Sequence, residues 1–125
     1  MIYLDTHTVA WLYAKELNRF TRAGLESLEA NELLISPMVA LELEYLHEIG
    51  RIQTTSRIIC DSLEKAVGLR VCECAFAPIM RLALEQSWTR DPFDRIIVAQ
   101  AKLADAPLLT KDSAIRKHYK KAFWD

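Results

Sequence analysis

Glycine and proline are scarce in this 125-residue chain, which has only 3 of the former and 4 of the latter. Because these residues punctuate turns and loops, their scarcity indicates a chain built mainly from helices. No apolar run approaches the roughly 20 residues that a membrane helix needs. The first residues carry no basic segment, and Asp5 interrupts the apolar start, so we expect no signal peptide, no membrane association and a cytoplasmic location.

A strong charge of either sign is also absent. The chain has 16 basic and 17 acidic residues, which gives a formal net charge of −1. A nucleic-acid partner would therefore have to be held by a local basic patch rather than by the field of the whole molecule. The three cysteines, Cys60, Cys72 and Cys74, form no Cys-x-x-Cys pair, which disfavours a zinc site and favours free, buried thiols.

The composition that remains is that of an ordinary globular protein, and we expect one domain over residues 1–125. Short apolar segments predict strands at residues 2–4, 33–35, 69–72, 107–110 and 122–124. The predicted helices between them cover residues 8–15, 20–30, 37–50, 55–67, 77–86, 92–105 and 113–119. This alternation predicts an α/β fold in which helices cover both faces of a short, mainly parallel sheet.

Two acidic residues follow predicted strands. Asp5 comes directly after the first strand, and Asp112 closely follows the strand that ends at Thr110. In parallel α/β folds the reactive site lies beyond the carboxyl ends of the strands, so both acids fall where chemistry is expected. Each one alone is equally compatible with an ordinary loop acid.

Two further acids extend apolar helix faces. In the helix that begins at Pro37, Glu42 fills the gap in a predicted inward stripe, whereas Glu44 projects away from it. The residues of that stripe are Met38, Leu41, Tyr45, Leu46 and Ile49. In the helix that begins at Pro92, Asp94 aligns with Ile97, Val98 and Ala101.

Structural explanations exist for these acids as well. Asp91 precedes Pro92 and is a typical helix N-cap, and Asp94 is placed to interact with the free amides of the first turn. Glu42 is compatible with pairing to a buried arginine. The occurrence of all the acids together favours one cluster.

Such a cluster requires a cation, since two carboxylates 4 Å apart repel by roughly 4 kcal/mol at an effective dielectric constant near 20. The group must bind protons or a metal, and hard divalent ions such as Mg²⁺ prefer oxygen ligands. A metal on open carboxylates suits phosphodiester hydrolysis, because it activates water and neutralises charge on the phosphate.

Four segments of the chain, taken in order, resemble the PIN domain family, specifically VapC-type toxin ribonucleases. They are Met1-Ile-Tyr-Leu-Asp5-Thr-His, Ser36-Pro-Met-Val-Ala-Leu-Glu42, Arg90-Asp-Pro-Phe-Asp94-Arg-Ile-Ile-Val-Ala-Gln-Ala and Leu108-Leu-Thr-Lys-Asp112. Each segment is weak alone, but four at this spacing in so short a chain are a strong signal.

The resemblance implies a three-layer α/β/α PIN-like domain that cuts RNA with Mg²⁺ or Mn²⁺. It implies catalytic and metal-binding roles for Asp5, Glu42, Asp94 and Asp112, in that order, with Asp91 as the alternative third ligand. Thr110 matches a hydroxyl residue that often precedes the fourth acid. The implied partners are an RNA substrate, a cognate antitoxin protein and a second copy of the chain.

Several residues near the acids are candidates for supporting roles or for contact with substrate: Thr6, His7 and Arg95. For His7, a structural hydrogen bond at the start of the next helix is the simpler interpretation. Residues 111–121 carry five basic side chains against Asp112 alone. These side chains are candidates to steer an RNA backbone, but four of them, Arg116, Lys117, Lys120 and Lys121, are equally compatible with a solvated helix face.

Other functions remain open on the sequence. A catalytically inactive domain of the same fold that binds RNA or protein is the main alternative. A phospho-acceptor receiver domain is disfavoured, because Thr6 stands where an acidic pair is needed. A phosphatase of the haloacid dehalogenase type would need Asp-x-Asp where this chain has Asp5-Thr6-His7. A nuclease acting on DNA would use the same metal chemistry.

Overall fold

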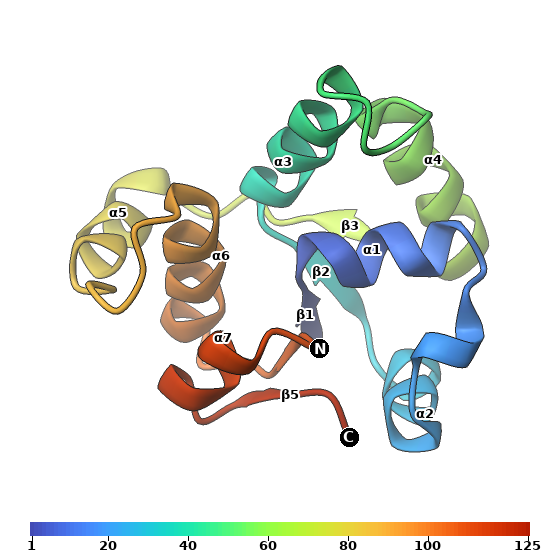
Figure 1. The fold of residues 1–125 in the computed structure, drawn as a ribbon. Helices are drawn as coiled ribbons and strands as arrows, with labels where there is room; N and C mark the ends of the chain where they lie inside the picture. The colour runs from blue at the N-terminus through green and yellow to red at the C-terminus, as the bar shows by residue number, and fades with distance from the viewer.

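A computed structural model describes all of residues 1–125 and shows a five-stranded sheet with helices on both faces (Figure 1). The strands are β1 (Ile2–Leu4), β2 (Leu33–Ile35), β3 (Arg70–Val71), β4 (Leu108–Leu109) and β5 (Ala122–Phe123). The helices are α1 (Thr6–Tyr13), α2 (Arg22–Ala30), α3 (Pro37–Glu48), α4 (Ser56–Val67), α5 (Phe76–Leu84), α6 (Pro92–Leu103) and α7 (Ser113–His118). The predicted α/β alternation is confirmed. A short 3-10 helix, η1 (Leu17–Arg19), was not expected.

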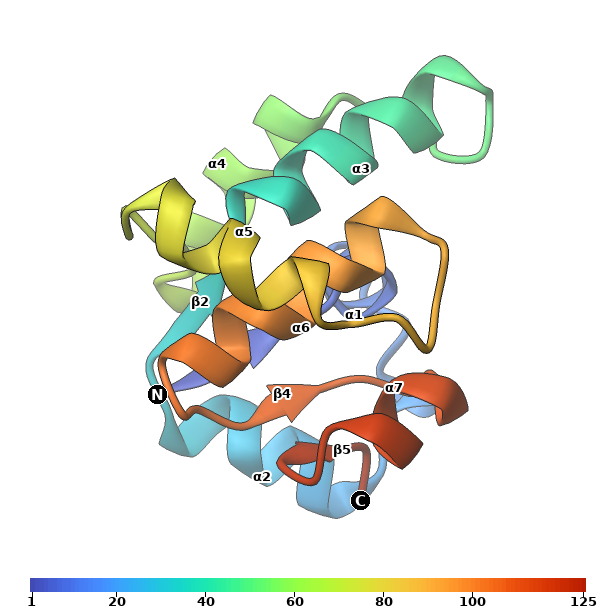
Figure 2. The same cartoon turned by 90° about the vertical axis from the view of Figure 1, so that its left-hand side faces the viewer.

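The strand order places β1, the strand that Asp5 follows, at the centre of the sheet. The order is β3-β2-β1-β4-β5, and every neighbouring pair is parallel. The chain runs outward from β1 to β3, and α5 and α6 then carry it back to β4 on the other side of β1. Figure 2 shows these two helices in front of the strands, and Figure 1 shows α1, α2 and α4 on the opposite side. The strand order therefore reverses between β1 and β4, which is where open α/β sheets bind ligands.

The short strands are continuous apolar segments because helices bury them from both faces. All three residues of β1 are buried, as are those of β2 and β4. Buried residues of α1, α3 and α6, among them Val9, Leu43 and Val98, pack in the same core cluster. The centre of the sheet is thus a rigid base for the side chains that follow it. None of the helices combines the length and the apolar composition that a membrane-spanning segment requires.

The predicted inward stripe of α3 is wrong for three of its five residues, although Met38 does pack against the core. Leu41, Tyr45 and Ile49 are 56%, 46% and 50% exposed, whereas Val39 and Leu43 are fully buried. This helix is apolar on more than one side, so the periodicity fits two faces and tertiary packing selects one of them. Glu42 still borders the buried face, because it lies three residues after Val39. Glu44, expected to be solvated, is half-buried and accepts a hydrogen bond from the Ser56 amide at the start of α4, at 3.1 Å.

The three cysteines are free, as expected, but they are not all buried. Cys72 is buried, Cys60 is half-buried and Cys74 is exposed. Cys74 follows the edge strand β3, where the chain leaves the sheet, so no neighbouring strand covers it.

Candidate active site

Asp5 lies at the centre of the candidate site, directly after β1. It is the N-cap of α1, and its Oδ1 accepts hydrogen bonds from the Thr8 amide at 3.0 Å and the Thr8 hydroxyl at 2.6 Å. The Thr110 hydroxyl donates to its other oxygen. The residue is only 7% exposed, and burial raises the pKa of Asp5 above its ordinary value, although the bonds from Thr110 and Thr8 oppose this shift. The sequence therefore builds a fixed, buried carboxyl at the end of the central strand.

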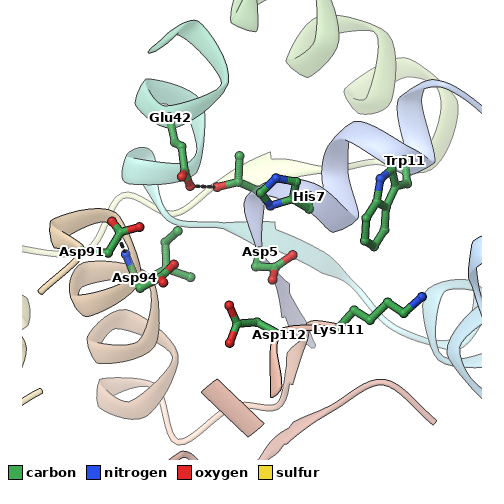
Figure 3. Close-up of a pocket in the computed structure, with 10 residues that line it drawn as sticks. Asp5, His7, Trp11, Glu42, Asp91, Asp94, Lys111 and Asp112 are labelled. Atoms are coloured by element: carbon green, nitrogen blue, oxygen red, sulfur yellow. Dashed lines mark hydrogen bonds between the residues drawn. The ribbon is translucent and has the colours of Figure 1, made fainter. Parts of the chain in front are cut away.

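Glu42 reaches the site from α3. The Thr6 hydroxyl donates a hydrogen bond to its Oε1, which ties α3 to the first residue of α1 (Figure 3). Burial is the main cause that raises the pKa of Glu42, and the negative charges of Asp91 and Asp5 add to the rise. Thr6 and the nearby His7 act in the opposite direction.

Asp91 and Asp94 enter from the N-terminus of α6. Asp91 is the N-cap of this helix, and its Oδ1 accepts hydrogen bonds from the amides of Phe93 at 2.8 Å and Asp94 at 3.4 Å. The pKa of Asp94 is raised to about 7. Burial is the largest cause, and the negative charges of Asp91, Asp112, Glu42 and Asp5 add to it. The charges of four neighbouring acids therefore act on Asp94, which lies in the field of the whole group.

Asp112 completes the group after β4. Its Oδ1 accepts a hydrogen bond from the Ile115 amide at 2.9 Å, which makes it the N-cap of α7. The Asp112 amide donates to the Thr110 hydroxyl at 3.1 Å, and that hydroxyl donates to Asp5. Thr110 is fully buried and therefore links the two acids that follow β1 and β4.

These acids face one cavity of about 470 Å³. Its lining residues are Asp5, Thr6, His7, Trp11, Glu42, Asp91, Asp94, Ile97, Lys111 and Asp112. Figure 3 shows the carboxylates pointing toward this space from α3, from α6 and from the ends of β1 and β4. The structure thus brings together the four predicted acids, Asp91, Thr6 and His7.

Two of the predicted supporting residues lie outside the cavity lining. Thr110 lies behind Asp5, and Arg95 turns its Nε to the Thr89 carbonyl oxygen at 2.9 Å. Lys111 and Trp11 line the cavity as well; the sequence had offered Lys111 only as one of the basic side chains that are candidates to steer RNA, and it did not single out Trp11. The available signal for Lys111 was its position directly before a predicted site acid. Trp11 carried no such signal, since its place in α1 is typical of a core residue.

The donor set fits a hard divalent cation. No group of three or more acidic, histidine or cysteine side chains is arranged to hold one ion directly. Mg²⁺, however, usually contacts one or two protein carboxylates and keeps several waters, and this cavity has five lining carboxylates with room for water. No cysteine lines it, which disfavours softer metals. A cation held by one or two of these acids and by water suits the arrangement.

Comparison with known proteins agrees with this architecture. The family model for the PIN domain matches residues 2–121, so the chain belongs to the PIN domain family. A curated relative, ribonuclease VapC22 of Mycobacterium tuberculosis (strain ATCC 25618 / H37Rv), is 32% identical over 123 residues, covering 94% of this chain and 91% of the relative. A solved structure of VapBC2 from Rickettsia felis, bound to a DNA fragment from its promoter, includes a chain with a TM-score of 0.71 at 20% identity, with full coverage of both chains.

Proposed function

We propose that this protein is a metal-dependent endoribonuclease that hydrolyses RNA phosphodiesters and acts as the toxin of a toxin–antitoxin pair. The observation that carries the proposal is the convergence of five carboxylates on one cavity at the reversal point of the sheet. The similarity to a ribonuclease over nearly the whole chain supports the same activity.

Each acid has a role that follows from its position. Asp5, the most buried and most firmly held, is the central ligand for Mg²⁺ or Mn²⁺, and Asp94 and Asp112 flank it from α6 and α7. Glu42 orients the attacking water or holds a second ion. A cation bound here would neutralise charge on the phosphate and lower the pKa of the attacking water.

The remaining site residues position these acids or contact substrate. Thr110 and Thr6 fix the carboxyls of Asp5 and Glu42 through their hydroxyl groups. His7 and Lys111 line the cavity, and their nitrogen donors are of the kind that contacts phosphate groups. Asp91 raises the negative charge near Asp94 while it caps α6, and Arg95 holds the turn that precedes this helix.

The proposed partners are an RNA substrate, a cognate antitoxin and a second copy of the chain. The exposed apolar side chains Leu41, Tyr45 and Ile49 on α3 are of the kind that a protein partner covers. The related solved structure holds a VapBC complex, which is a pairing of this kind. A cytoplasmic location forms part of the proposal, since that is where a toxin of this type meets RNA.

The direct test is cleavage of total bacterial RNA by the purified protein with Mg²⁺ or Mn²⁺, with EDTA, and with the Asp5→Asn variant. We expect discrete fragments only when both the metal and Asp5 are present. Glu44→Gln is a matched control. Glu44 is on the same helix as Glu42, but its side chain accepts a hydrogen bond from the Ser56 amide at the start of α4 and does not line the cavity. Cleavage that persists unchanged in EDTA would contradict the proposal. RNA binding without any cleavage would favour an inactive binding module.

A further inference from the structure

A second cavity, separate from the carboxylates, is lined mainly by cations. It has a volume of about 460 Å³ and lies around α7, so we name it the α7 cavity. Its lining residues are Lys102, Asp105, Arg116, Lys117, His118, Tyr119, Lys120 and Lys121. Five basic side chains face one carboxylate, which gives a local charge of +4 in a chain whose net charge is −1. The cavity therefore carries a net positive charge, although the whole chain does not.

Most of the charges of this cavity form no ion pair within the chain. Its one acid, Asp105, is already engaged, because Lys121 Nζ lies 2.9 Å from the Asp105 carboxylate and donates to the Asp105 carbonyl oxygen at 3.0 Å. Lys102, Lys117 and Lys120 take part in none of the four ion pairs of the structure. Like charges held around one concavity repel each other, and a bound anion relieves that repulsion.

Contacts join two residues of the α7 cavity to the chain segments that lead into Asp112 and Asp91. Arg116 Nη2 donates to the carbonyl oxygen of Lys111 at 3.1 Å, and the Lys111 side chain lines the carboxylate cavity. The His118 ring stacks on Trp88, with centroids 4.8 Å apart and planes inclined by 4°. Trp88 belongs to the segment that leads into Asp91. Asp112 caps the start of α7 at the carboxylate cavity, and the same helix carries Arg116 and Lys117, so a strand that leaves this cavity along α7 meets these basic side chains.

We propose that the α7 cavity binds phosphate groups of the RNA strand outside the cleavage point. This proposal rests on the proposed ribonuclease function, because it extends the substrate path of that same site. Flexible lysines bind a polyanion by releasing its counterions, without selecting a base sequence. The cavity presents several such lysines and does not enclose a single ligand. This arrangement suits a nucleic-acid strand better than a free phosphate ion.

The test is binding of a fluorescent uridine oligonucleotide of about 16 residues, a length that spans more than one phosphate subsite. Measurements use the Asp5→Asn background, where we expect no cleavage, at several salt concentrations. Replacing Lys117 and Lys120 by glutamine should weaken binding roughly fivefold to tenfold at low salt. The slope of log affinity against log salt should fall by about 0.7 for each phosphate contact that is lost, or about 1.4 for two.

Three controls make the result specific. Lys65→Gln removes an exposed lysine of α4 and should leave the affinity unchanged. Lys117→Arg with Lys120→Arg keeps the charge and should retain binding. Inorganic pyrophosphate at moderate concentration should compete weakly, whereas a DNA strand of the same length should show the same lysine dependence.

An affinity and a salt slope that match those of the Lys65→Gln protein would overturn the proposal. Unchanged RNA binding together with weakened antitoxin binding would assign the cavity to an acidic protein segment and would also overturn it. Strong competition by pyrophosphate would identify a free phosphate site and reject the strand. The experiment measures binding and not cleavage. A protein that binds RNA through these lysines but never cuts it would therefore contradict the ribonuclease proposal and leave the binding proposal standing.

Discussion

Three of the five carboxylates in the cavity also cap helices. Asp5, Asp91 and Asp112 each accept a backbone hydrogen bond at the start of α1, α6 and α7 respectively. One oxygen of each makes that bond, and a carboxylate has further lone pairs on the other oxygen. A capping role and a ligand role are therefore compatible in the same residue. The amides fix the orientation of the side chain, which is what a preorganised site requires.

At Asp5 this double role makes a specific prediction for stability. In Asp5→Asn, the amide oxygen still accepts from Thr8, and the Thr110 hydroxyl can rotate to accept from the new NH₂ group. Removing a buried negative charge also relieves repulsion, so we expect the free energy of unfolding to change by less than about 1 kcal/mol or to rise. Cleavage should fall by at least roughly a hundredfold.

Urea denaturation and a cleavage assay on the same protein sample measure both effects. A variant that cuts RNA at the normal rate would refute the role given to Asp5. A variant that unfolds much more easily would refute the account of its hydrogen bonds.

The pKa of Asp94 predicts how stability depends on pH. In the folded protein this pKa is raised from 3.8 to about 7, so folding favours the protonated form. The resulting stabilisation is complete below about pH 4 and is lost as the pH rises through 7. In EDTA we expect the melting temperature to fall over this window, relative to Asp94→Asn, by several degrees, since about 1 kcal/mol corresponds to roughly 4 °C.

Thermal melting of the wild-type and Asp94→Asn proteins from pH 4 to pH 8 measures this difference. Mn²⁺ should reduce the loss in the wild-type protein, because the cation favours the ionised carboxyl. Parallel pH curves for the two proteins in EDTA would contradict the assignment.

At the scale of single elements, the start of α6 separates the two roles of Asp91. Asp91→Ala removes the N-cap and should cost about 1 kcal/mol of stability, whereas Asp91→Ser keeps a capping oxygen and should cost only a few tenths. Both variants remove the charge of Asp91, which raises the pKa of Asp94 more than the charge of any other neighbouring acid does. Both should therefore move the pH-dependent loss of stability to lower pH.

Chemical denaturation across pH tests this pair of substitutions. A serine variant with normal stability and an unshifted pH curve would show that Asp91 acts only as a cap.

The elements that the sequence predicted well are those with unambiguous signals. Ser36-Pro37 predicts the start of α3, and Asp91-Pro92 the start of α6, because a capping side chain and a proline suit only the first turn. The apolar stripe of α6 is confirmed, since Ile97, Val98 and Ala101 are buried. The face of α3 could not be chosen, because two apolar stripes compete and only the position of the sheet decides between them.

The short 3-10 helix η1 was missed for a comparable reason. Residues 17–19 have no apolar repeat and no buried residue, so neither periodicity nor burial marks them. Contacts between side chains that are far apart in the sequence could not be predicted either. The bond from Thr6 to Glu42 and the stacking of Trp88 on His118 join residues whose proximity depends on the complete tertiary structure.

At the scale of the whole molecule, the sequence placed the site but not its shape. Parallel strands end at one edge of a sheet, so Asp5 and Asp112 had to lie near each other once β1 and β4 were neighbours. Periodicity supplied Asp94, and Glu42 reached the cavity although the stripe used to predict it was wrong. The positions of Lys111 and Trp11 and the existence of the α7 cavity depend on how the helices pack in the complete fold. A single domain over residues 1–125 stays a prediction.

The central claim is that these carboxylates together form one site for a divalent cation, and Mn²⁺ titration by isothermal calorimetry tests it most directly. We predict binding to the wild-type protein, binding at least roughly tenfold weaker in Asp5→Asn and in Asp94→Asn, and wild-type binding in Glu44→Gln. No measurable Mn²⁺ binding by the wild-type protein, or equal binding by all four proteins, would contradict the account.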